Sequence, residues 1–101
     1  MADRLQYLVR LLGTRAGWPE NMTAEEERIM SDHFEYLRDL TEKGIVLMAG
    51  PVFDYKFGLI VLEVESESEL EKIMQAEPSV MQGVHTYDKS IMRVSLMAKR
   101  A

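Results

Sequence analysis

The sequence contains no cysteine and no long apolar run, and both absences limit what the protein can be. Without cysteine the chain forms no disulfide bonds. None of its apolar runs approaches the roughly 20 residues that a membrane-spanning helix requires. Its first residues, Met1-Ala2-Asp3-Arg4, lead directly into an alternating segment instead of a signal-peptide core. We therefore expect a cytoplasmic protein that has no membrane partner.

Clusters of positive charge are also absent. The chain has 12 Lys and Arg against 17 Asp and Glu, a formal net charge of −5, and no basic stripe that could neutralise phosphates. Its six glycines are scattered and form no phosphate-binding or dinucleotide fingerprint. The two histidines, His33 and His85, lie far apart without the neighbouring ligands of a metal signature. We expect no nucleic-acid partner, no cofactor and no metal.

What the sequence does have is the composition of one globular domain. It contains 101 residues, of which 47% are apolar and 29% are charged. These proportions are ordinary for a folded protein and exclude disordered and fibrous classes. A chain of this length has no room for a second hydrophobic core. We therefore expect a single domain over residues 1–101.

Four apolar segments predict β-strands, at residues 5–12, 45–49, 58–65 and 91–97. The first three are mostly apolar, which indicates burial, and we expect strand 45–49 to be central in its sheet. The last alternates apolar and polar residues, as a half-exposed strand does. The short connection between the second and third strands predicts a hairpin, and hence antiparallel pairing.

Two helices are predicted between these strands. Thr23 and Glu26 form a capping box, and apolar residues at three- and four-residue spacings continue from it to Lys43. Ser66 and Ser68 are alternative N-caps for the second helix. The element order is then β-α-β-β-α-β.

This order predicts an α+β, ferredoxin-like fold, in which both helices cover one face of a four-stranded antiparallel sheet. The other sheet face is left without a cover. Because the strands are apolar on both faces, and large apolar patches are rare on monomers, we expect a homodimer formed through that face.

Several short segments, spread over nearly the whole chain, have an order and spacing that is fairly specific as a set. They are Met22-Thr23-Ala24-Glu25-Glu26, His33-Phe34-Glu35-Tyr36-Leu37, Ala49-Gly50-Pro51-Val52 with Asp54, Gly58 with Leu62-Glu63, and Pro78-Ser79-Val80 with Gly83. With these segments the chain resembles YCII-related proteins of the dimeric α/β-barrel group.

The resemblance implies a ferredoxin-like homodimer with a pocket that holds a histidine and an aspartate as an acid/base pair. The matching positions in this sequence are His33 and Asp54. The wider group includes small-molecule enzymes, among them dehydrochlorinases of hydroxylated aromatics and lactone isomerases. One departure is Glu77 before Pro78, where the family usually has aspartate. Glutamate keeps the negative charge of aspartate, but its longer side chain places the carboxylate farther from the backbone.

His33 interrupts an apolar helical stripe, so its imidazole needs a hydrogen-bond partner once it is buried. One interpretation is a core histidine that donates to a backbone carbonyl. In the other, Asp54 orients the ring and leaves the second nitrogen free to exchange protons with a substrate near neutral pH. Asp54 also lies in a turn sequence, where aspartate is common for purely local reasons.

Two further residues are candidates for the site. Trp18 lies in a segment without a period, residues 13–21, which predicts a long loop of the kind that often borders a site. It either closes over a pocket and binds the ligand or only anchors its loop on the core. His85 could form a second acid/base group with Asp88, although we expect it in a surface connection before the last strand.

Two functions remain open at this stage. The first is a cofactor-independent lyase or isomerase of a small molecule, with His33 as general base and Asp54 as its orienting carboxylate. The second is a non-catalytic dimeric module that binds a small ligand or serves as an accessory subunit, with His33 as a core residue.

Overall fold

The strands and helices follow the predicted β-α-β-β-α-β order, with one short helix added before the last strand. The structure is a computed structural model and describes residues 4–98, so the two ends of the expected domain lie outside the described residues. Its elements are β1 (Leu5–Gly13), α1 (Ala24–Glu42), β2 (Val46–Val52), β3 (Phe57–Val64), α2 (Glu67–Ala76), α3 (Pro78–Met81) and β4 (His85–Met92).

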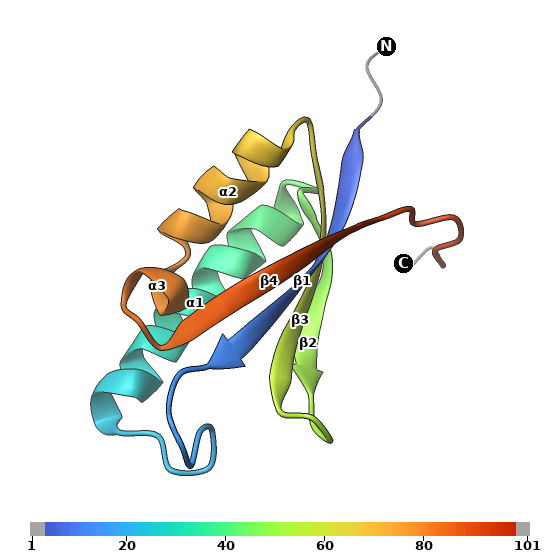
Figure 1. Cartoon of the computed structure of the whole chain (residues 1–101). Coiled ribbons are helices and arrows are strands. Elements are labelled where there is room, and N and C mark those ends of the chain that lie inside the picture. Colours follow the sequence, from blue (N-terminus) through green and yellow to red (C-terminus); the bar gives the residue numbers. More distant parts are fainter. Residues whose placement is uncertain (1–3, 99–101) are drawn as a thin grey trace.

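The strands form one antiparallel sheet in the order β2-β3-β1-β4, and the helices lie on one face of it (Figure 1). The predicted α+β, ferredoxin-like fold is confirmed. The central position expected for the second strand is wrong, because β2 lies at an edge. Pro51 gives the reason, since it has no N–H for a second neighbour and is tolerated only on an edge strand. It pairs there with Gly58 of β3.

The last strand begins and ends earlier than predicted. It covers His85–Met92, whereas the predicted strand at residues 91–97 continues past its end, and Leu96 is 94% exposed. The pairing with β1 runs from Gly13 opposite His85 to Gln6 opposite Met92. It therefore uses almost the full length of β1, and little of that strand is left for the following residues to pair with.

The core lies between the helices and the sheet. Alternate residues of β1 and β3 face the helices, where they pack with residues of α1 and α2. The most deeply buried apolar side chains are Val9, Leu11, Val46, Ile60, Leu62, Val64, Leu70 and Met74. The intervening residues form what we call the open sheet face, which no helix covers (Figure 1). Within residues 4–98, no helix has the length and apolar character needed to cross a membrane.

Helix α1 starts and stops as the sequence predicts. The Thr23 hydroxyl accepts from the Glu26 backbone N–H, and the Glu26 carboxylate accepts in return from the Thr23 N–H. At the other end, Gly44 has φ 78°, the left-handed conformation that glycine adopts without a steric penalty. The helix buries only Leu37 and Leu40 fully. His33, on the same side of the helix, is partly buried.

Candidate functional site

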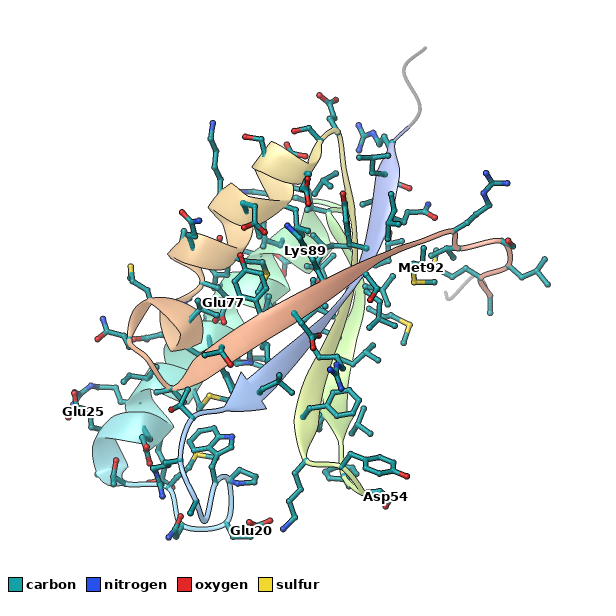
Figure 2. All side chains as sticks on the ribbon, in the orientation of Figure 1. Glu20, Glu25, Asp54, Glu77, Lys89 and Met92 are labelled. Atoms are coloured by element: carbon teal, nitrogen blue, oxygen red, sulfur yellow. The ribbon has the colours of Figure 1, made fainter. Side chains whose placement is uncertain are left out.

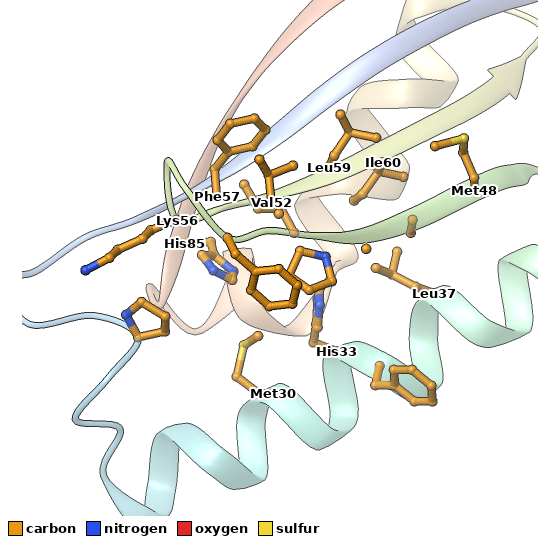
Figure 3. A pocket seen from close by; sticks show the side chains of 18 of the residues that line it. Met30, His33, Leu37, Met48, Val52, Lys56, Phe57, Leu59, Ile60 and His85 are labelled. Carbon is orange, nitrogen blue, oxygen red and sulfur yellow. The ribbon is translucent and has the colours of Figure 1, made fainter.

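A cavity of about 850 Å³ lies between helix α1 and the β2–β3 side of the sheet (Figure 3). Its walls are mostly apolar and include Met30, Leu37 and Ile60. Space is available here because the helix-facing positions at this end of the two strands carry small side chains. Ala49 lies opposite Ile60, and Gly58, which has no side chain, lies two positions before it. A pocket of this size with few polar groups is typical of a site for small molecules.

His33 on α1 meets a carboxylate at the edge of this cavity. Its Nδ1 lies 2.8 Å from Oε1 of Glu77, whose side chain is completely buried. Glu77 is both the C-cap of α2 and the N-cap of α3, so two helix ends hold it in position. The Ser79 backbone N–H donates to the same oxygen at 3.2 Å, as in an ordinary N-cap.

Ser79 extends this contact to the second histidine. Its hydroxyl donates to Oε2 of Glu77, and its oxygen lies 2.8 Å from Nδ1 of His85. The side chains of His33, Glu77, Ser79 and His85 thus form one hydrogen-bonded chain, which we call the imidazole–carboxylate network.

The donors and acceptors of this network determine the tautomers of both rings. An ionised Glu77 only accepts, so Nδ1 of His33 carries the hydrogen that it donates. Ser79 has a single hydroxyl hydrogen and gives it to Glu77, so Nδ1 of His85 must also carry a hydrogen. In their neutral forms both imidazoles therefore have an unprotonated Nε2.

Both Nε2 atoms are open to the cavity. Within residues 4–98, neither makes a hydrogen bond to the protein, and no buried side-chain nitrogen or oxygen lacks a partner. The two nitrogens are therefore not sealed in the core. Both rings line the cavity, with their centroids 5.9 Å apart (Figure 3).

Burial and charge set the protonation of the network. Burial raises the pKa of Glu77, but the hydrogen bonds from His33 and Ser79 outweigh it and the pKa lies below its ordinary value. Burial, followed by the charge of His33, lowers the pKa of His85 to about 4, against an opposing effect of Glu77. At neutral pH, Glu77 is therefore a carboxylate and His85 is an uncharged imidazole.

Two other chemistries do not fit this arrangement. Serine, histidine and an acid also make up acyl-transfer triads, but Ser79 is completely buried, so its oxygen cannot reach a substrate. In the part of the chain that the structure describes, no group of three potential ligands is arranged to hold a metal ion.

Comparison with known families gives the same assignment as the sequence resemblance. The model of the YCII-related domain matches residues 15–92, which include α1, β2, β3, α2, α3, β4 and the entire network. The chain belongs to the YCII-related family. A search of curated proteins found no significant match. In this YCII-related chain the residue before Pro78 is the glutamate that binds His33.

Trp18 lies in the wall of the YCII-domain cavity. Its ring contacts that of His85 edge to face, with centroids 5.3 Å apart and an interplanar angle of 89°. Arg15 holds this loop on α1 through two hydrogen bonds to the Glu26 carboxylate, at 2.8 and 2.6 Å, and through two more to Asn21. A part for Trp18 in ligand binding stays a prediction.

Asp54 lies at the exposed tip of the β2–β3 turn, well away from Glu77 (Figure 2). Among the described residues it makes no hydrogen bond to His33, whose Nδ1 contacts Glu77. Two other residues of the same turn, Phe53 and Lys56, do line the cavity. The structure thus brings His33 and Trp18 to one cavity, whose lining does not include Asp54, and the predicted pairing of His33 with Asp54 stays a prediction.

Two of the four network residues, Glu77 and Ser79, are not among the site residues that the sequence predicts, and His85 lies elsewhere than predicted. The surface connection expected for His85 is wrong, since this residue is 6% exposed and begins β4, while Asp88 pairs with Arg10. In the sequence, Glu77 stands out only as a departure from the family pattern. A local signal for its buried position exists in Glu77-Pro78-Ser79, because an acidic residue before proline is a favourable start for a short helix. The cap places its carboxylate on the backbone N–H of Ser79.

Proposed function

We propose that this YCII-related protein is a cofactor-independent lyase or isomerase that moves a proton on a small, largely apolar molecule. The observation that carries the proposal is the contact between Nδ1 of His33 and the buried Glu77 carboxylate. It fixes the ring in one tautomer and leaves Nε2 open to an apolar cavity. A base oriented in this way by a carboxylate is the usual arrangement for proton transfer near neutral pH.

In the proposed mechanism, Nε2 of His33 removes a proton from a carbon next to a carbonyl or from a phenol. The imidazolium that forms is stabilised by the negative charge of Glu77, which stays ionised. His33 then returns the proton to another carbon of the same molecule, which gives an isomerase. Alternatively, the electron pair expels a leaving group, which gives a lyase. The first outcome corresponds to lactone-isomerase-like chemistry and the second to dehydrochlorinase-like chemistry.

Two residues at the cavity have supporting parts in this proposal. Trp18 supplies an aromatic wall for the ligand. Asp54 reaches the ligand in this proposal when the β2–β3 turn shifts toward α1, and the support for this is that Phe53 and Lys56 of the same turn line the cavity. Such a shift would add a second carboxylate to the site of His33.

The experiment is a proton-exchange screen in D₂O. Lactones and hydroxylated aromatics are incubated with the wild-type protein, and the loss of C–H signals is followed by proton NMR. His33→Asn keeps a donor toward Glu77 and removes the base. We expect exchange of at least one compound with the wild type, and a rate about 100-fold or more lower with His33→Asn. Asp32→Asn, an exposed neighbour on α1, is the matched control and should retain the wild-type rate.

The alternative is a non-catalytic module that binds a small ligand, and the apolar cavity is the observation in its favour. The same screen distinguishes the two functions. Compounds that shift the resonances of cavity residues without any exchange at carbon would support the binding module. Equal exchange rates for the wild type and His33→Asn would remove His33 from the mechanism.

We also propose that the protein is a homodimer formed through the open sheet face. The residues of this face include Leu8, Met48, Leu59, Val61 and Met92, which lie between the helix-facing positions in the strand registers. Met48 and Leu59 also line the cavity, which therefore reaches this face near the β2 edge. Met48 is 56% exposed, and the apolar side chains form a surface that no helix covers. Packing against a second copy would remove this surface from water.

A further inference from the structure

His85 offers the cavity a second nitrogen whose hydrogen-bonding character is set by the protein. Ser79 accepts from Nδ1 of His85 at 2.8 Å and passes its own hydrogen to Glu77. Nε2 of His85 is therefore an acceptor that faces the cavity without a protein partner in the described part of the chain. A serine fixed in this way cannot rotate its hydrogen toward His85 without giving up the bond to a buried carboxylate.

We propose that His85 contacts the ligand and selects an uncharged, largely apolar molecule that carries a hydroxyl or N–H donor. An acceptor in an apolar cavity favours a ligand that donates a hydrogen bond. A ligand without a donor displaces water from Nε2 and leaves this nitrogen without a hydrogen bond. The donor of the ligand would lie near His85 while another part of the same molecule lies near His33. The two rings, 5.9 Å apart, are close enough for one small molecule to contact both.

The charges around the cavity explain why the ligand should be neutral. Among residues 4–98, four charged residues line it, Glu20, Arg38, Glu42 and Lys56, and each of them is more than half exposed. They form two ion pairs, Lys56 with Glu20 at 3.0 Å and Arg38 with Glu42 at 3.7 Å, so both positive charges in the described lining are balanced and neither attracts an anion.

The interior of the site also disfavours a negative ligand. Glu77 is ionised one residue away from His85 in the network, and burial lowers the pKa of His85 to about 4, so this ring brings no positive charge at neutral pH. Near the two histidines, an anionic ligand would lose its hydration and meet the acceptor nitrogen of His85 and a nearby carboxylate.

The inference rests on the proposed function only in placing the ligand in the same cavity, and it does not require turnover. The probes are benzyl alcohol, benzyl methyl ether, which lacks the donor, and benzoate, which carries a charge. Titrations are followed by ¹⁵N NMR of the histidine rings in the wild-type protein at neutral pH. We expect His85 to be protonated at Nδ1, and its Nε2 resonance to move on addition of benzyl alcohol.

The expected selectivity follows from one neutral hydrogen bond. Benzyl alcohol should bind about two- to tenfold more tightly than benzyl methyl ether, and benzoate should bind more weakly than benzyl alcohol. His85→Phe and His85→Asn, each checked for folding by circular dichroism, should reduce the ratio of alcohol to ether to about one. Thr86→Ala, at the next and exposed position of β4, should keep the wild-type ratio.

Three results would overturn the inference: a His85 ring protonated at Nε2 in the wild type, equal binding of the alcohol and the ether, or an unchanged ratio in both His85 variants. These results are separate from the proton-exchange screen. Donor-selective binding without proton exchange would refute the proposed reaction and support the part assigned to His85. Proton exchange without donor selectivity would support the proposed reaction and refute the part assigned to His85.

Discussion

Nδ1 of His33 lies 2.8 Å from Oε1 of Glu77, and this contact joins the middle of helix α1 to the junction of α2 and α3. The carboxylate has no exposed surface and also accepts hydrogen bonds from the backbone N–H and the hydroxyl of Ser79. A buried charge is tolerated when its hydrogen bonds are complete, as they are here. The same contact therefore contributes to the stability of the fold and orients the proposed base.

Replacing this carboxylate by its amide should destabilise the protein. In Glu77→Gln, the amide N–H₂ cannot accept from Ser79 or from His33, so at least one buried donor of the network loses its partner. We expect the free energy of unfolding to fall by about 1–3 kcal/mol, as measured by urea denaturation. Glu65→Gln, an exposed carboxylate at the end of β3, should change it by less than about 0.5 kcal/mol. Equal effects of the two substitutions would contradict the importance of the network.

The stability of the fold should fall as the pH drops below 6.5. The pKa of His85 is lowered to about 4 in the folded chain, from the ordinary value of 6.5 expected in the unfolded chain. At pH values between these two, His85 is protonated in the unfolded chain and uncharged in the folded chain. This difference favours unfolding by about 2 kcal/mol at pH 5 relative to pH 7.

Urea denaturation at the two pH values measures this effect. His85→Asn removes the titrating group, so its loss of stability from pH 7 to pH 5 should be smaller by that amount. Glu77 acts in the same direction at lower pH, because a carboxyl group whose pKa is lowered loses its stabilising contribution as the pH falls below its ordinary value of 4.5. The same pH dependence in both proteins would mean that His85 is protonated in the folded state.

A methyl group at Gly13 should displace Trp18. An added Cβ would lie 2.3 Å from Cδ1 of the indole ring, which is too close for any arrangement without movement. In Gly13→Ala we expect Trp18 to leave His85, with a shift of its fluorescence to longer wavelength and a loss of about 1–3 kcal/mol in stability. Trp18 is the single tryptophan, so the emission reports this residue alone. Gly50→Ala is the control, since nothing lies within 4 Å of its added Cβ, and its emission should match the wild type.

Substitution of Asp54 tests the pairing predicted from the sequence. Because Glu77 contacts Nδ1 of His33, Asp54→Asn should leave the ¹⁵N resonances of His33 unchanged in the ligand-free protein, whereas Glu77→Gln should move them. Recording the same spectra with a bound probe examines the proposed shift of the β2–β3 turn. A change at His33 in Asp54→Asn without ligand would indicate that the two residues pair directly.

A charge on the open sheet face should prevent dimerisation. Light scattering at micromolar concentration should give twice the monomer mass for the wild type and the monomer mass for Leu59→Glu, which would bury a carboxylate in the proposed interface. Met81→Glu is the control, because Met81 is 62% exposed on α3, on the helical side of the sheet. A monomeric wild type would refute the dimer.

The fold could be predicted because its signals are local. The capping box at Thr23, the stop at Gly44 and the apolar strands each depend on a few neighbouring residues. The errors arose where tertiary pairing decides. The alternation in residues 91–97 is a good strand pattern, but the length of β1 determines where β4 ends. The edge position of β2 likewise depends on strand order. Pro51 favours an edge strand, whereas the apolar run at residues 45–49 favours a central one.

The site was harder to predict because its network joins residues that are distant in sequence. His33 and Trp18 were found because each is unusual for its segment. Glu77 and Ser79 look like an ordinary helix start, and His85 looks like part of a polar connection. Only the packing of α3 against α1 brings the carboxylate to the imidazole, and no periodicity in the sequence reports that contact.

Because Glu77 caps helix α3 with the same oxygen that holds His33, the first turn of a four-residue helix controls whether the site exists. If this turn frays, the carboxylate loses its anchor, and the imidazole is then free to change its tautomer. The rate at which the Ser79 backbone amide exchanges with deuterium therefore measures how often the site comes apart, without any need to know the ligand.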